Sequence, residues 1–170
     1  MQFEKLLSGG DLRSIGKSDS IVSNIDNQDD FDGLFQCLFH NDRIVAMRAA
    51  DAVEKITVSN PSYLRKHKME IIELCNTAEY KELKWHLALL VPRLNYGGED
   101  FDHIWNLLSK WATNKDESKI VRVNSLQGLF ELSKQERGLA QNLDLIFTEL
   151  ERENIPSLNA RIKNIRKQIT

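Results

Sequence analysis

Apolar and small side chains recur along this chain with the spacing of one helix face. In four stretches they occupy positions i, i+4, i+7, i+8 and i+11, which line one face of an α-helix and cannot line one face of a strand. The positions are Val45, Ala49, Ala52, Val53 and Ile56; Leu83, Leu87, Leu90, Val91 and Leu94; Val121, Ser125, Gly128, Leu129 and Leu132; and Leu158, Ile162, Ile165, Arg166 and Ile169. Their last members fall at residues 56, 94, 132 and 169, so the pattern repeats after 38, 38 and 37 residues. A helical period of this length indicates a solenoid of stacked helices.

Each repeated stretch is preceded by a second segment with helical apolar spacing. These segments contain Phe31, Leu34, Phe35, Leu38 and Phe39; Leu64, Met69, Ile71, Ile72 and Leu74; Phe101, Ile104, Trp105, Leu107, Leu108 and Trp111; and Leu139, Leu143, Ile146, Phe147 and Leu150. Residues typical of helix ends separate the segments, as in Asn60-Pro61, Gly97-Gly98 and Asn154-Ile155-Pro156. The pattern predicts an all-α fold of about four antiparallel helix pairs over residues 28–170, preceded by an N-terminal arm and cap helix over residues 1–27.

One of the repeated stretches resembles a known repeat family. Residues 42–56 are similar to the second helix of a HEAT repeat, whose pattern is an aspartate, a Val-Arg pair, small apolar pairs and an apolar end. Here Asp42 supplies the aspartate, and Arg48 follows Met47 where the family has a valine. Residues 81–94 and 119–132 match the pattern at their apolar positions alone. The chain as a whole resembles small stand-alone HEAT-like proteins of bacteria, with an armadillo-type fold. The resemblance implies one domain over residues 1–170, wound as a right-handed α-α superhelix.

Composition and charge narrow the class of protein. A chain that is 41% hydrophobic and 28% charged has enough apolar material for a continuous core. The formal charge of −2 gives no general affinity for nucleic acid. Cys37 and Cys75 lie among apolar helical residues, and no apolar run approaches the ~20 residues that span a bilayer. We therefore expect a reduced, cytoplasmic protein without a membrane anchor.

The polar positions of the repeated helices form rows in the predicted stack. Second helices of stacked pairs usually line the concave side, and helices ~8–10 Å apart would extend the row Arg48, His86, Asn124 and Arg161 over ~25–30 Å. The residues predicted to bind a partner there are Arg48, Asp51, Lys55, His86, Arg93, Asn124, Gln127 and Arg161. Such a row suits an extended peptide, a partner helix or a nucleic-acid backbone. The alternative is a solvated face with local ion pairs.

The middle of this row contains two rings and a proline. Trp85 aligns with apolar residues of the other helices and is expected to pack, whereas His86 aligns with polar residues and is expected to be exposed. Pro92 lacks an N–H donor and crowds the carbonyl of Ala88, so a bend is expected within this helix.

An N-terminal Gly-Lys-Ser sequence resembles part of a phosphate-binding loop. Five residues separate Gly10 from Gly16, where the Walker A motif has four, and no apolar strand precedes them. This argues against nucleotide hydrolysis. Arg13, Lys17 and Ser18 beside a helix start are candidates for binding a small anion. The alternative is an arm that covers the first repeat.

We find no pattern for catalysis, metal binding or a cofactor. Cys37 and His40 are spaced i, i+3, but no second Cys/His pair completes four metal ligands, so Cys37 is expected to be a small core residue. Single histidines without a nucleophile or carboxylate at defined spacing indicate no catalytic set.

The two ends of the chain differ in charge. Residues 19–42 contain six aspartates and no Lys or Arg, whereas the last repeated helix contains Arg161, Lys163, Arg166 and Lys167 and no acid. Helix electrostatics explains much of this difference. The functional alternatives are a basic end that contacts an acidic partner or nucleic acid, and head-to-tail contact between copies.

Two functional hypotheses follow. The first is a non-enzymatic interaction or scaffold module that binds another protein or peptide through its concave face. The second is a DNA-binding or DNA-repair protein similar to the alkylpurine DNA glycosylases built on HEAT-like repeats. In that protein Arg48, Arg93 and Arg161 would contact phosphates, and Trp85, Trp105 or Trp111 would lie near a damaged base.

Overall fold

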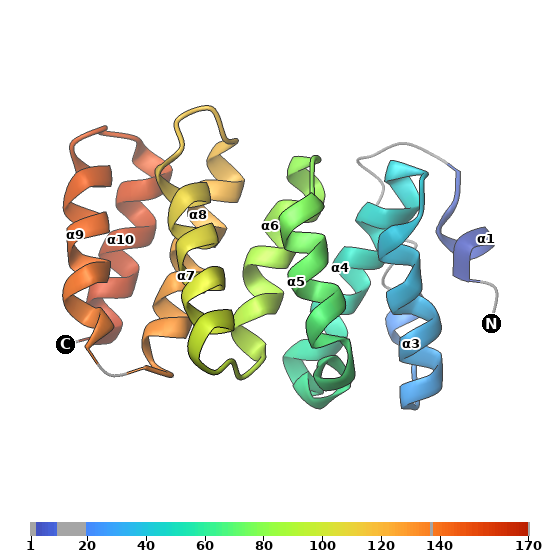
Figure 1. Cartoon of the computed structure of the whole chain (residues 1–170). Coiled ribbons are helices and arrows are strands. Elements are labelled where there is room, and N and C mark those ends of the chain that lie inside the picture. Colours follow the sequence, from blue (N-terminus) through green and yellow to red (C-terminus); the bar gives the residue numbers. More distant parts are fainter. Residues whose placement is uncertain (1–2, 10–19, 137, 170) are drawn as a thin grey trace. The chain divides into compact units, whose positions relative to one another are not determined.

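The computed structural model describes residues 3–9, 20–136 and 138–169, and over these ranges it contains helices and no strand (Figure 1). The α-helices are α1 Phe3–Leu7, α3 Gln28–Gln36, α4 Arg43–Ser59, α5 Lys68–Thr77, α6 Lys81–Leu90, α7 Gly98–Thr113, α8 Lys119–Ser133, α9 Leu139–Glu151 and α10 Pro156–Ile169. Shorter 3₁₀ segments are η1 Cys37–Phe39, η2 Pro61–His67 and η3 Val91–Arg93. The predicted all-α fold of the solenoid type is confirmed.

The chain divides into two compact units, Met1–Leu87 and Ala88–Thr170, and the boundary falls within α6. In the first unit α4 is the central helix, because it contacts α1, α3, η1 and η2. In the second unit α8 is the central helix, because it contacts α7, α9 and α10. The expectation of one domain over residues 1–170 stays a prediction.

The apolar pattern identifies the interior of both units. Every position of the four repeated stretches is buried except Leu83, which is half-buried, and Arg166 and Ile169, which are exposed. Among the partner helices, the prediction that Phe39 and Met69 belong to the core is wrong, since 42% and 66% of these side chains is exposed. Phe39 ends η1, whose tighter winding shifts the helical register. Met69 lies opposite the buried face of α5.

Short polar side chains cap the N-terminal ends of α3 and α4. Asn27 accepts a hydrogen bond from the backbone N–H of Asp30 at 3.0 Å and caps α3. Asp42 accepts from the N–H of Ile44 at 2.8 Å and caps α4. Asn60-Pro61 starts the 3₁₀ segment η2, so the α-helix expected there begins only at Lys68.

The bend expected at Pro92 is a helix end. The α-helical part of α6 stops at Leu90, and Pro92 lies in η3. Pro92 has no N–H to donate to the carbonyl of Ala88. Gly128 of α8 approaches that carbonyl so closely that a Cβ on Gly128 would lie 2.4 Å from its oxygen and 2.8 Å from Cδ1 of Leu108. The absent side chain of Gly128 therefore sets how closely α8 packs in the second unit.

Gly128→Ala is expected to lower the free energy of unfolding by about 1–3 kcal/mol, because the added methyl group overlaps backbone that cannot move aside. This loss is net of the better helix propensity of alanine. Urea unfolding followed by circular dichroism measures it. Gly97→Ala is the matched control, since no atom lies within 4 Å of its added Cβ, and its change should be about 1 kcal/mol or less. Equal losses in the two variants would contradict the packing argument.

Candidate functional site

The structure corrects the position of Arg48. This side chain was expected on an open polar row, but it is fully buried. Its Nη1 donates hydrogen bonds of 2.6 Å to the carbonyl oxygens of Leu7 and Gly9, at the C-terminal end of α1. The segment around α1 covers this face of α4, and the guanidinium provides a donor for the buried carbonyl of Leu7 as well as for that of the more exposed Gly9. Arg48 therefore stabilises the first unit and is not available to contact a partner or a phosphate directly.

The other polar row residues of the first unit are mostly internal as well. His86 was expected to be exposed, yet only 6% of the residue is, because Glu54 of α4 reaches it with a Nδ1···Oε2 distance of 2.5 Å. Asp51 is 9% exposed and accepts a 2.7 Å hydrogen bond from Lys55. Lys55 alone among these keeps a substantial exposed part, 36% of its side chain. Trp85 is half-buried beside His86, so the expectation that it packs is met only in part.

In the second unit two of the predicted polar residues, Gln127 and Arg161, are hydrogen-bonded to each other. Nη1 of Arg161 donates to Oε1 of Gln127 at 2.8 Å, which joins α10 to α8. Gln127 in turn donates to Glu131 at 2.9 Å, and Lys134 forms an ion pair with the same carboxylate at 2.7 Å. Arg93, Asn124, Gln127 and Arg161 are all half-buried.

The candidate anion-binding residues Arg13, Lys17 and Ser18 lie outside the described residues. The DNA-repair hypothesis loses several of its residues. Trp105 and Trp111 are 8% and 5% exposed within α7 and cannot stack on a base, and Arg48 is buried.

Sequence analysis missed a second buried arginine. Arg122 of α8 is 2% exposed; its Nε donates to the carbonyl of Ala112 at 2.8 Å, and its two terminal nitrogens bind Glu153 at 3.0 and 2.8 Å. The hydrogen bonds from Arg122 lower the pKa of Glu153 more than burial raises it. Val121-Arg122 is the Val-Arg pair of the HEAT pattern, intact, and this signal was present in the sequence.

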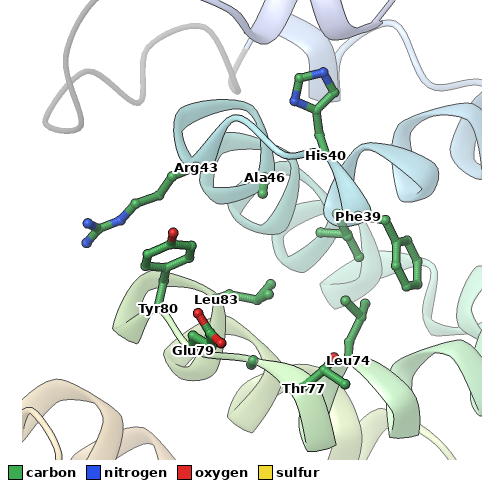
Figure 2. Close-up of a pocket in the computed structure, with 11 residues that line it drawn as sticks. Phe39, His40, Arg43, Ala46, Leu74, Thr77, Glu79, Tyr80 and Leu83 are labelled. Atoms are coloured by element: carbon green, nitrogen blue, oxygen red, sulfur yellow. The ribbon is translucent and has the colours of Figure 1, made fainter.

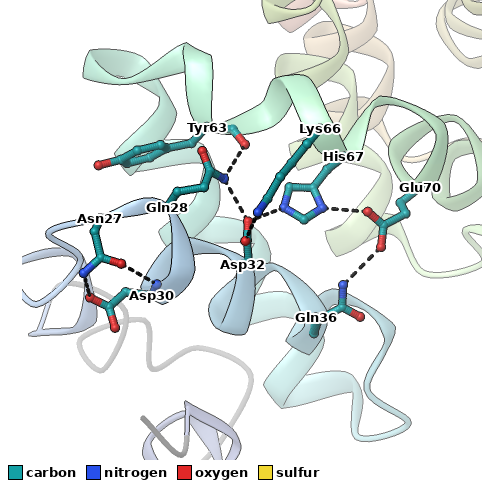
Figure 3. Close-up of polar contacts among 9 residues, drawn as sticks. All are labelled: Asn27, Gln28, Asp30, Asp32, Gln36, Tyr63, Lys66, His67 and Glu70. Carbon is teal, nitrogen blue, oxygen red and sulfur yellow. Dashed lines mark hydrogen bonds and ion pairs between the residues drawn. The ribbon is translucent and has the colours of Figure 1, made fainter.

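A polar cluster joins the first helices of the first unit (Figure 3). His67 of η2 is 5% exposed and stacks on Phe35 with ring centroids 3.9 Å apart. Its Nε2 lies 2.7 Å from Oδ1 of Asp32, and its Nδ1 lies 2.6 Å from Oε2 of Glu70. Lys66 forms an ion pair with the same Asp32. The cluster therefore ties α3 to η2 and α5.

These contacts change the acidity of both carboxyl groups. Burial alone would raise the pKa of Asp32, but hydrogen bonds from Lys66, Gln28 and His67 outweigh it and lower the pKa to about 2. Burial likewise opposes ionisation of Glu70, and hydrogen bonds from His67 and Gln36 lower its pKa. Neither carboxyl group faces a nucleophile here, so we interpret the cluster as structural.

The first unit also contains a pocket that the sequence did not reveal (Figure 2). It has a volume of about 240 Å³ and lies between the start of α4 and the turn that joins α5 to α6. Arg43 and Tyr80 lie at one end, and Phe39 and Thr77 lie at the other (Figure 2). The lining residues are Leu38, Phe39, His40, Arg43, Ala46, Leu74, Thr77, Ala78, Glu79, Tyr80 and Leu83. Phe39 and Tyr80 are exposed at 42% and 48%.

Polar contacts hold the rim of this pocket. The guanidinium of Arg43 lies 4.6 Å above the ring centroid of Tyr80, and its Nη2 forms a 2.6 Å ion pair with Glu82. Nδ1 of His40 accepts a 2.9 Å hydrogen bond from the backbone N–H of Asp42, which fixes the ring. The rim is thus an aromatic surface whose polar groups are already oriented.

The cysteines agree with the sequence analysis. Cys37 and Cys75 are both free and buried, and Cys37 is a small core residue as expected. Burial raises the pKa of both thiols, that of Cys37 to about 11.

Two further kinds of feature are absent from the described residues. No group of three or more His, Cys, Asp or Glu side chains there is placed to hold a metal ion. No helix in the described ranges is both long and apolar enough to span a bilayer.

Comparison with protein families agrees with this architecture. Residues 9–169 match the family model described as the HEAT repeat domain, and the chain therefore belongs to the HEAT repeat family. This confirms the resemblance seen in residues 42–56. Proteins of this family generally serve protein interaction and are not enzymes. No curated protein and no solved structure matches the chain.

The Asp32 cluster leads to a prediction of pH dependence. The carboxyl of Asp32 ionises more readily in the folded chain than at its ordinary pKa of 3.8. Its contribution to the free energy of unfolding is therefore complete above about pH 4 and is lost as the pH falls towards 2. Asp32→Asn should lower the stability above pH 4 and flatten its decline below. Urea unfolding at several pH values between 2 and 7 measures both effects.

Asp29→Asn provides the matched control for Asp32→Asn. It removes an exposed carboxylate of the same helix that contacts neither His67 nor Lys66. It should keep the wild-type decline between pH 4 and 2. A wild-type decline in Asp32→Asn as well would show that the cluster does not carry this pH dependence.

Proposed function

We propose that this protein is a non-enzymatic interaction module that binds a segment of another protein, anchored in the pocket beside Phe39 and Tyr80. The observation that carries this proposal is a preformed concavity between two exposed aromatic rings. Membership of the HEAT repeat family supports it. We also assign the protein to a reducing, cytoplasmic compartment, which suits its two free and buried cysteines.

The size of the pocket favours one side chain over a small molecule. Its volume of about 240 Å³ lies below the ~300–1,000 Å³ of typical ligand sites. An apolar side chain entering it would cover Phe39, Tyr80 and the half-buried Leu83. Aromatic residues around such an anchor often contribute most of the binding energy of an interface. The occupant is therefore an apolar side chain of a protein segment.

The pocket needs little rearrangement to receive that side chain. Arg43 is held by Glu82 and by the ring of Tyr80, and Phe39 packs edge-on against Phe35 with centroids 6.3 Å apart. Ordering side chains on binding costs about 0.5–1.5 kcal/mol for each flexible group. The contacts that already hold Arg43 and Phe39 reduce this cost, so less of the binding free energy is lost when the apolar side chain enters the pocket.

The exposed part of the predicted polar row is the second element of the proposal. In each unit by itself, these residues would contact polar groups of a bound protein: Lys55 in the first unit, and Arg93, Asn124, Gln127 and Arg161 in the second. The 2.8 Å hydrogen bond between Arg161 and Gln127 supports this by orienting both side chains in advance. Arg48, Asp51 and His86 no longer belong to the set, because they are buried.

Phe39→Ser combined with Tyr80→Ser should reduce the amount of bound partner about tenfold, since both rings would leave the rim of the pocket. The measurement is quantitative mass spectrometry of proteins that co-purify with the tagged chain from its own cells. Val58→Ser combined with Met69→Ser is the matched control, because these exposed apolar residues of the first unit do not line the pocket. Circular dichroism verifies that all variants are folded.

Partners recovered equally with the pocket variant and the control would contradict the proposed anchor. The polar row is tested in the same purification with Gln127→Ala combined with Arg161→Ala. A severalfold loss of the same partner is expected if both surfaces contact it. An unchanged amount would remove the polar row from the proposal and leave the pocket.

A further inference from the structure

The outer side of the last helix pair contains a groove that the proposed function does not use. Residues Ala140, Asp144, Phe147 and Glu151 follow one another along α9 with helical spacing, and Asn159, Lys163 and Arg166 do the same along α10. Two concavities lie between these rows, one of about 410 Å³ and one of about 630 Å³. Arg166 lines both, so they are adjacent parts of one groove.

The repeat register shows that this groove is an uncovered interior surface. Arg166 and Ile169 occupy the last two positions of the apolar pattern, which are buried in the three preceding repeated stretches. In α10, Arg166 is exposed and Ile169 is 57% exposed. In α4 and α8 the equivalent residues pack against neighbouring helices. The end of α10 therefore presents, to solvent, a face that is elsewhere covered by a helix.

The groove is amphipathic along its length. One end is apolar, with Leu143, Phe147 and Ile169 in its lining. The other end contains Lys163 and Lys167, two exposed cations without an ion pair among the described residues. Arg166 separates the ends: it pairs with Asp144 at 3.1 Å and with Glu151 at 3.2 Å, and it lies 5.8 Å from the ring centroid of Phe147.

A buried acceptor adds a second polar feature to the basic end. The side-chain oxygen Oδ1 of Asn159 is shielded from water and accepts no hydrogen bond within the described part of the chain. Asn159 lines the same end of the groove as Lys163 and Lys167. Carboxylates of a partner would pair with the two exposed lysines, whereas Oδ1 of Asn159 lies beneath the surface of the groove.

We propose that an acidic amphipathic helix of a partner protein binds in this groove. Its apolar side chains would cover Ile169 and Ala140, the exposed apolar residues of the apolar end, and would close over the already buried ring of Phe147. Its carboxylates would pair with Lys163 and Lys167. A nucleic acid fits less well, because the apolar end offers no phosphate contacts and Asp144 and Glu151 face the same groove. This site is separate from the pocket of the proposed function.

The test uses a fluorescein-labelled peptide of about four helical turns, with leucines on one face and glutamates beside them. Fluorescence anisotropy at low salt should show saturable binding to the full chain. Lys163→Glu combined with Lys167→Glu should raise the Kd about tenfold, and so should Ile169→Ser through lost apolar contact. Arg65→Glu combined with Lys81→Glu is the matched control, because it makes the same charge change on exposed residues of the first unit.

Three results would overturn this proposal. The first is no saturable binding of the acidic peptide, or equal binding of a peptide with lysines in place of its glutamates. The second is tighter binding of a duplex DNA oligonucleotide than of the acidic peptide. The third is a dimer in sedimentation velocity that Ile169→Ser dissociates, since a second copy would then cover the groove. Phe39→Ser combined with Tyr80→Ser should leave peptide binding unchanged, so the two sites are tested independently.

Discussion

Burial of the apolar stripe on the repeated helices is the interaction on which the rest of the structure depends. In α4 and α8 all five pattern positions are buried, and one partner helix alone does not cover a stripe that wide. Such close packing removes backbone carbonyls at nearby helix ends from water. Arg48 and Arg122 resolve this in the same way, by donating from the central helix of each unit to the C-terminal end of another helix. Each unit is therefore stabilised by burial of its apolar stripe and by the hydrogen bonds of a buried arginine, Arg48 in the first unit and Arg122 in the second.

The same constraint decides which surfaces remain for binding. Polar residues near the centre of a unit are used internally, as the contact of His86 with Glu54 illustrates. Apolar residues stay exposed where the helical register is interrupted and at the C-terminal turn of α10. Phe39 lies at a 3₁₀ segment, Tyr80 at the turn before α6, and Ile169 at the C-terminal end of α10. The pocket beside Phe39 and Tyr80 and the groove that contains Ile169 both lie at such exposed apolar residues.

The sequence predicts the helices well because a buried helix face requires apolar residues at helical spacing, and this spacing is visible in the sequence. It predicts the polar site poorly because the exposure of a polar residue depends on segments distant in sequence. Arg48 is buried by the segment around α1, and nothing in its own helix indicates this. The pocket of Phe39 and Tyr80 arises where a 3₁₀ segment meets a turn, and no spacing rule identifies such a place. The burial of Arg122 could have been predicted from the sequence, because Val121-Arg122 matches the Val-Arg pair of the HEAT pattern.

The most direct test of the account replaces Tyr80 with the photo-crosslinking residue p-benzoylphenylalanine and irradiates cells that express the variant. The account predicts a covalent adduct of defined mass with another protein, because an occupied pocket places that protein in contact with residue 80. The same residue at position 58, which is exposed but outside the pocket, should give no such adduct. Absence of an adduct at position 80, or the same adduct at both positions, would contradict the claim that this pocket binds a partner.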